Sequence, residues 1–247
     1  MPTQPLSVQL YSVRDAVAAD LPGALTRLAG IGFTNVELYG FVDRADEYAA
    51  GLRDAGLSAP SGHAPVLQYD DPRAAFEAAK TVGVHTLIDP HHPAEHWQSA
   101  DDIKAAAERM NTIAAAAAEF DLAFGYHNHW FELEAHHDGV TGLELLEQHL
   151  DPAVVLEVDT FWVTVGGESA PALLGRFGDR VKFIHVKDGP ITRDTSTQLP
   201  AGQGDVDVRA VLAAAPQAMR VLEFDAYTGD PFDGLAESFR FVSELER

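Results

Sequence analysis

Strands and helices are predicted to alternate along this chain, with a repeat of about 30 residues. Short apolar runs bounded by turn residues indicate strands, and longer runs of helical periodicity indicate helices. The expected strands cover residues 6–11, 35–39, 58–63, 84–88, 122–128, 154–159, 181–187 and 219–225. The expected helices cover residues 21–30, 43–56, 72–82, 101–120, 141–149, 170–177, 206–214 and 232–246. Eight strand–helix repeats follow from this pattern.

The expected strands carry Val, Ile and Leu on both faces, which indicates a parallel sheet covered by helices. Eight such repeats in 247 residues fit an α/β protein with a single (β/α)8 TIM barrel, and we expect one domain over residues 1–247. The main alternative is an open, doubly wound sheet, whose nucleotide-binding form needs a glycine-rich turn after the first strand. Residues 11–15 at that place read YSVRD and contain no glycine.

Composition narrows the classes of function. The formal net charge is -21, with 38 acidic residues against 17 Lys and Arg, so the chain should repel nucleic acid and anionic membrane surfaces. The absence of cysteine excludes disulfides, thiolate metal sites and cysteine nucleophiles. The start lacks the pattern of a secretory signal, and no apolar run approaches the roughly 20 residues that span a bilayer. These observations predict a cytoplasmic protein.

Four polar clusters follow buried strands in the second half of the chain, at residues 127–132, 157–159, 185–188 and 223–225. Carboxylates and imidazoles are costly to bury alone, so these clusters need a shared compensating charge. A divalent metal bound by two or three carboxylates and an imidazole would supply that charge.

Side-chain alternation predicts where the clusters point. On three consecutive strands two polar residues share a face: Glu157 with Asp159, His185 with Lys187, and Glu223 with Asp225. Since helices cover the outside of a barrel, that face should be the lumen near its C-terminal mouth. On the fifth strand His127 and His129 share a face, and Glu132 lies beyond, where a bend would have to re-aim it. Glu132 is the expected carboxylate ligand from this strand, because hard cations prefer oxygen; His127 or His129 is the alternative.

The sequence resembles the sugar phosphate isomerase/epimerase group of xylose isomerase-like barrels over nearly its whole length. That group is similar to the endonuclease IV, hydroxypyruvate isomerase, ketose 3-epimerase and inosose dehydratase families. The most specific segments are YHNHWFE (126–132), LEVDTFW (156–162), HVKD (185–188), GQGD (202–205) and LEFD (222–225).

The resemblance implies a divalent metal ion, with Mn2+ expected first and Mg2+, Co2+ or Zn2+ as alternatives. Carried over by motif, its ligands would be Glu132, Asp159, His185 and Glu223. Epimerases usually place the first of these within the strand, where this chain has Gly125 or Tyr126.

The chemistry implied by the resemblance is proton transfer beside a carbonyl through a cis-enediolate. Glu132 and Glu223 would move the proton on opposite faces of the substrate, and Lys187 would supply a fixed positive charge near the developing oxyanion. Substrate contacts are expected from five further residues: His63, His91, His127, His129 and Trp162.

The predicted function is therefore a metal-dependent sugar isomerase or epimerase that acts on a small sugar or keto-sugar. The alternative is a lyase or dehydratase on an inosose or 3-keto-glycoside, which shares the first proton abstraction and is suggested by the His-Asn-His triplet of residues 127–129. A repair endonuclease is disfavoured by the negative charge. Only Lys187 and Arg193 are cations near the usual phosphate site of barrels, which disfavours a phosphorylated substrate. The resemblance also implies a homo-oligomer, and the long loop 188–205 is expected to overhang the mouth.

Overall fold

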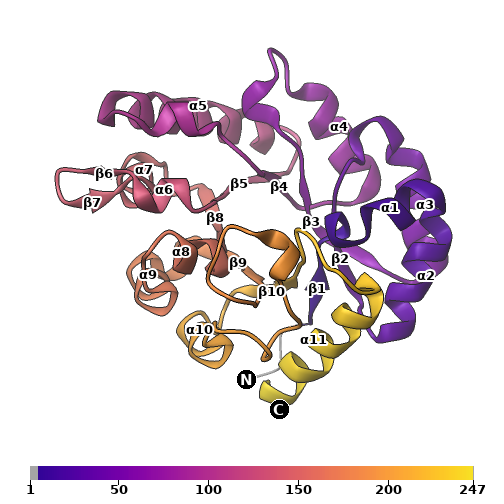
Figure 1. Cartoon of the computed structure of the whole chain (residues 1–247). Helices are drawn as coiled ribbons and strands as arrows, with labels where there is room; N and C mark the ends of the chain where they lie inside the picture. Colours follow the sequence, from indigo (N-terminus) through magenta and orange to yellow (C-terminus); the bar gives the residue numbers. More distant parts are fainter. Residues whose placement is uncertain (1–4, 247) are drawn as a thin grey trace.

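Eight parallel strands curl around a common axis in this computed structural model, and helices cover their outer face (Figure 1). The structure describes residues 5–246. Residues 1–4 and 247 lie outside the described residues. They include the start of the chain, where no secretory signal was predicted, and the last residue of the predicted domain. The strands are β1 (Ser7–Val8), β2 (Asn35–Leu38), β3 (Ser58–His63), β4 (Thr86–Asp89), β5 (Ala123–His127), β8 (Val154–Asp159), β9 (Val181–Val186) and β10 (Met219–Leu222). The (β/α)8 barrel predicted from the sequence is confirmed.

The ladders join the strands in the order β1-β10-β9-β8-β5-β4-β3-β2. The remaining gap, between β1 and β2, is bridged at one position, where Gln9 pairs with Glu37. The side-chain amide of Gln9 also donates a 2.8 Å hydrogen bond to Glu37 Oε1. The barrel is thus nearly closed, with one weakly paired seam.

All eight expected helices are present, and capping residues mark several of their ends. They are α2 (Leu21–Ile31), α3 (Ala45–Ala55), α4 (Arg73–Val82), α5 (Ala100–Ala118), α7 (Gly142–His149), α9 (Ala170–Phe177), α10 (Val208–Ala214) and α11 (Pro231–Leu245). The side chains of Asp20, Ser99 and Asp230 cap the first turns of α2, α5 and α11. Gly56 and Gly83 end α3 and α4 in the left-handed conformation.

Several short elements were not predicted. They are helices α1 (Arg14–Ala19), α6 (Phe131–Glu134) and α8 (Thr160–Val165), and a hairpin of β6 (His136–His137) with β7 (Val140–Thr141). Helix α8 begins directly after β8, because Asp159 Oδ1 accepts a hydrogen bond from the N–H of Trp162 and caps it. Helix α6 follows β5 after three residues and carries Glu132. Both helices therefore position predicted site residues.

The barrel interior is apolar toward the N-terminal ends of the strands and polar toward their C-terminal ends. Ile88, Phe183 and Val221 form a small buried cluster of their own, separate from the main core. Two residues further toward the C-terminal ends, the inward side chains are His185 on β9 and Glu223 directly after β10. The apolar layer closes the barrel from beneath, so ligands can reach the polar layer only from the C-terminal mouth. Among the described residues, no helix has the length and apolar character needed to cross a membrane.

Candidate active site

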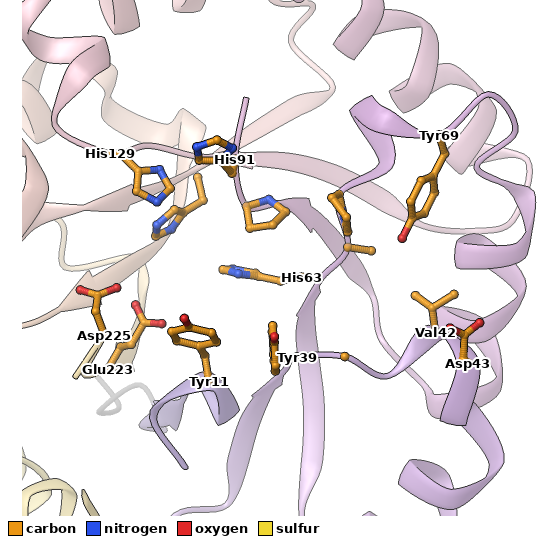
Figure 2. A pocket seen from close by; sticks show the side chains of 15 residues that line it. Tyr11, Tyr39, Val42, Asp43, His63, Tyr69, His91, His129, Glu223 and Asp225 are labelled. Atoms are coloured by element: carbon orange, nitrogen blue, oxygen red, sulfur yellow. The ribbon is translucent and has the colours of Figure 1, made fainter. Parts of the chain in front are cut away.

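A pocket of about 420 Å³ opens at the C-terminal mouth of the barrel. Figure 2 shows His63 near its centre, Tyr11 and Tyr39 along one side, and Glu223 and Asp225 at one end. The other ionisable or aromatic lining side chains are Asp43, Tyr69, His91, His127 and His129. The lining thus combines three tyrosines from the first half of the chain with imidazoles at or after the ends of β3, β4 and β5 and with carboxylates after β2 and β10.

Three of the four predicted metal ligands lie together. Asp159, His185 and Glu223, here called the outer group, each offer a ligand atom within 4.8 Å of the others. The ammonium of Lys187 lies 2.9 Å from Asp159 Oδ2 and 2.6 Å from Glu223 Oε2. It also lies 2.9 Å from Asp225 Oδ2. Burial opposes the charge of Lys187, but the three carboxylates outweigh it and raise its pKa well above the usual value. Lys187 is therefore a fixed cation among these carboxylates.

Neighbouring residues hold the outer carboxylates in place. The N–H of Asp159 donates to Asn128 Oδ1 at 3.0 Å, which ties the end of β8 to the segment after β5. Gln198, in the long loop, donates to Asp225 Oδ2 at 2.7 Å and accepts from the Asp225 N–H at 2.8 Å. The pKa of Glu223 is lowered although burial opposes this, because Lys187 and His185 favour its charged form.

A second cluster, here called the inner group, consists of His63, His127, Glu157 and His185, whose ligand atoms also lie within 4.8 Å of one another. Glu157 Oε1 is 2.7 Å from His63 Nε2, 3.0 Å from His127 Nδ1 and 3.0 Å from His185 Nε2. Glu37, on β2, flanks the group: its Oε1 lies 3.1 Å from His63 Nε2 and 2.7 Å from His185 Nε2.

His185 belongs to both groups through its two ring nitrogens. Its Nδ1 contacts Glu223 at 2.7 Å, while its Nε2 faces the two inner carboxylates. Burial opposes protonation of His63, but Glu37 and Glu157 outweigh it and raise the pKa of His63 to about 10. Burial and the neighbouring imidazoles hold the pKa of His127 well below its usual value, so His127 is neutral.

Glu132, the predicted strand-five ligand, belongs to neither group. Its Oε1 accepts a 2.8 Å hydrogen bond from the Tyr126 hydroxyl, and its Oε2 accepts a 2.9 Å hydrogen bond from the His129 N–H. Burial raises the pKa of Glu132 to about 8. A side chain at Gly125, within the strand, has no room, since a Cβ there would lie 2.9 Å from Val155 Cγ2.

The remaining predicted site residues divide between the pocket and its support. His63, His91, His127 and His129 line the pocket. Trp162 does not: it is buried against Trp130, with ring centroids 4.7 Å apart. Loop 188–205 contributes no lining residue and reaches the site only through Gln198.

Sequence reasoning left Glu37, Gln9 and the two rim tyrosines, Tyr11 and Tyr39, out of the site. Glu37 had a usable signal, because NVELY places one acid between apolar residues on a buried strand. Gln9 had the same signal, because LSVQLY places it between two buried apolar residues. Tyr11 lies in the short 3-10 helix Leu10–Val13 and Tyr39 just after β2, so both lie past the strand ends, where strand periodicity gives no direction.

The donors of both groups suit a divalent ion, which imidazoles and carboxylates bind well. In the outer group an ammonium already neutralises the carboxylates. Glu157 Oε2 of the inner group and Asp159 Oδ2 of the outer group are both buried without a hydrogen-bond partner, although Asp159 Oδ2 lies 2.9 Å from the Lys187 ammonium. The residues present therefore fit a metal at the mouth, and the inner group is the one that holds no ammonium.

Comparisons with known proteins agree with this architecture. The family model described as xylose isomerase-like TIM barrel matches residues 25–244. A search of curated proteins found no match. Among solved structures, a sugar phosphate isomerase/epimerase from Parabacteroides distasonis is similar, with a TM-score of 0.83 at 21% identity; the match covers 100% of this chain and 96% of that one.

Two further structures show the same fold. The IOLI protein with a bound zinc atom has a TM-score of 0.75 at 14% identity, covering 98% of each chain. The probable 3-DHS dehydratase AsbF from Bacillus anthracis has a TM-score of 0.76 at 13% identity, covering 97% of this chain and 98% of that one. At these identities the likeness concerns the fold.

Proposed function

This chain belongs to the family of xylose isomerase-like TIM barrels, and on that premise we propose that it is a divalent-metal-dependent sugar isomerase or epimerase. The observation that carries the proposal is the joining of Asp159, His185 and Glu223 with an inner cluster of histidines at the base of one open pocket. A carboxylate, a fixed cation and metal-binding side chains at one place are what proton transfer beside a carbonyl requires.

The pocket also supports a neutral substrate. Its lining contains no Lys or Arg among the described residues, so nothing there would pair with a phosphate group. Tyr11 and Tyr39 meet edge to face at the rim, with centroids 4.9 Å apart, and offer an apolar surface for a sugar ring. We therefore propose an unphosphorylated keto-sugar or ketose as the substrate.

The roles of the chain's residues follow from their contacts. Glu223 lines the pocket, is held ionised by Lys187 and His185, and would take the proton from the carbon beside the carbonyl. Lys187 would stabilise negative charge near that carboxylate. A bound divalent ion would polarise the carbonyl. Glu132, the other predicted proton carrier, does not line the pocket and would instead hold the segment after β5.

A lyase remains the second candidate, for one structural reason. An epimerase needs proton carriers on both faces of the substrate, and only Glu223 of the predicted pair lines the pocket. A lyase that eliminates a β-substituent needs one base and one acid that protonates the leaving group. Glu223 would be that base, so the lyase needs no second carboxylate in the position predicted for Glu132.

Solvent-proton exchange tests the proposal. We expect metal-loaded protein to incorporate deuterium from D2O into a neutral ketose or 3-keto-glycoside, measured by NMR and mass spectrometry. Glu223→Gln should lower the exchange rate by at least about 100-fold, since general-base catalysis contributes on that order. Release of water or an aglycone would assign the lyase.

The matched control is Glu237→Gln, which removes a carboxylate located away from the pocket, where Glu237 accepts a hydrogen bond from Gln203. This variant should exchange at the wild-type rate. Absence of exchange with every neutral ketose and keto-glycoside would refute both activities.

A further inference from the structure

Two nitrogen atoms of the inner group face more acceptors than they can serve. His63 Nε2 lies 3.1 Å from Glu37 Oε1 and 2.7 Å from Glu157 Oε1. His185 Nε2 lies 2.7 Å and 3.0 Å from the same two oxygens. Each nitrogen carries at most one hydrogen, so it can donate to only one of its two neighbours. Hydrogen bonding therefore does not account for all four contacts.

The spacing matches the ligand shell of a metal ion. Bonds from a divalent ion such as zinc to imidazole nitrogen or carboxylate oxygen are about 2.1 Å long. Ligand atoms then lie about 3.4 Å apart in a tetrahedral site and about 3.0 Å apart at the right angles of a six-coordinate site, and the separations here match the six-coordinate site. The four contacts above span 2.7 to 3.1 Å, and His127 Nδ1 lies 3.0 Å from Glu157 Oε1. One cation could contact these atoms at once.

The charges are also compatible with a cation. Glu37 and Glu157 are both fully buried, and no Lys or Arg among the described residues forms an ion pair with either. The buried ammonium of Lys187 contacts Asp159, Glu223 and Asp225 instead. Without an ion, burial opposes protonation of His63 and His185, but the neighbouring carboxylates outweigh it and raise the pKa of both rings, so two protonated imidazoles balance the two inner carboxylates. A dication would take the place of those two protons and leave the three imidazoles neutral.

The strands are locally adapted at these two acids. The register of β2 with β3 shifts between Asn35 and Glu37, and the register of β8 with β9 shifts between Leu156 and Glu157. Such irregularities re-aim side chains and occur often beside active sites. The second oxygen of Glu157 is buried without a hydrogen-bond partner, so it is free to bind an ion.

We propose that the metal ion of this protein is held by the inner group, through His63, His127, Glu157 and His185 with Glu37 beside them, and that Lys187 occupies the outer group in place of a metal. This deepens the proposed function and rests on it. Because His63 and His127 line the pocket, the ion would lie at the pocket floor and be open to substrate. Three imidazoles favour Zn2+ or Co2+ over Mg2+.

Metal binding to the purified chain tests this assignment without any substrate. Protein stripped with EDTA is loaded with Zn2+ or Co2+, and bound metal is measured by elemental analysis and titration calorimetry. We expect one ion per chain. His63→Asn and His127→Asn should each raise the Kd at least about 100-fold, more than the loss of a supporting residue would cause. His91→Asn, a pocket histidine outside both groups, should leave the Kd unchanged.

A variant in the outer group serves as the comparison for the two inner variants. Asp159→Asn should keep the metal, because Asp159 belongs only to the outer group. The melting temperature in EDTA shows whether each variant folds. X-ray absorption on the wild-type Co2+ protein needs no variant: the inner group predicts three imidazole ligands and the outer group one.

The outcomes separate this inference from the proposed function. Loss of metal in Asp159→Asn but not in His63→Asn and His127→Asn, a one-imidazole spectrum, or no bound ion would overturn the inner assignment, whether or not proton exchange occurs. Metal binding lost in the two inner variants, with no exchange on any keto-sugar, would uphold the assignment and reject the proposed function.

Discussion

Glu132 is a buried carboxyl group that accepts two hydrogen bonds and is nevertheless uncharged. Its pKa is raised to about 8, mainly because it is fully buried, while hydrogen bonds from Tyr126 and His129 only partly oppose this. Its position in α6, beyond the end of β5, explains why strand alternation did not predict its contacts.

Titration of Glu132 should make stability depend on pH. A carboxyl group whose pKa is raised in the folded state contributes stability that is present below its unfolded pKa, about 4.5, and lost as pH rises through about 8. Glu132→Gln mimics the neutral form, so the variant should gain roughly 4 kcal/mol of unfolding free energy relative to wild type between pH 5 and pH 9. Urea unfolding at each pH measures this difference.

Glu134→Gln is the control, because Glu134 lies in the same short helix but is exposed and pairs with Arg193. It should show no comparable change with pH. Equal slopes for Glu132→Gln and wild type would mean that Glu132 is ionised in the folded protein.

At the scale of elements, the long loop after β9 is held by one buried carboxylate. The two oxygens of Asp188 accept hydrogen bonds from four backbone N–H groups, those of Gly189, Gly202, Gly204 and Val206, at 2.8 to 3.0 Å. A Cβ at Gly204 would lie 2.2 Å from Gly189 N, so the GQGD segment needs glycine there. The backbone N–H groups of this segment thus bind the chain's own anion.

Asp188→Asn should therefore destabilise the loop and the fold. The amide keeps one acceptor oxygen but turns an NH2 group toward N–H donors, so we expect a loss of about 2 to 4 kcal/mol in the free energy of unfolding. Thermal and urea unfolding measure it. Asp194→Asn, which caps an exposed turn of the same loop, should cost about 1 kcal/mol or less. Equal losses in the two variants would contradict a special role for Asp188.

The elements predicted from the sequence were those whose pattern is repeated along their length. Helix α5 has 19 residues and a clear cap, and its apolar face recurs over many turns. Helices α6 and α8 have four and six residues, too few for periodicity to show. Helix α8 forms because the side chain of Asp159, at the end of β8, accepts a hydrogen bond from one of its first N–H groups. Helix α6 has no side-chain cap and depends on its packing against the barrel.

At the scale of the whole molecule, the members of both groups could be predicted to face the mouth, but the joining of the inner group with Glu37 could not. Alternation along β8 and β9 assigns Asp159 and His185 to one face, and adjacent strands bring them together. Glu37 meets His185 only because the sheet closes into a barrel and brings β2 across the lumen. The register shifts at Glu37 and Glu157, which no sequence period encodes, complete that contact.

The seam between β1 and β2 should be the least stable part of this barrel. Strand β8 pairs along its length with β5 and β9, whereas β2 has a full ladder only with β3 and meets β1 through the single Gln9–Glu37 bridge. Local opening of β2 therefore breaks fewer backbone hydrogen bonds than opening of β8. In native-state hydrogen exchange, protection of amides in residues 35–38 should be at least about tenfold lower than in residues 154–159, a difference of about 1.4 kcal/mol.

Gln9→Leu removes the 2.8 Å bond to Glu37 and should lower protection in β2 further while leaving β8 unchanged. Gln217→Leu, an exposed glutamine that bonds Gly178 O, should change neither strand. Equal protection in both strands would show that the barrel opens as one cooperative unit and that the seam does not weaken it.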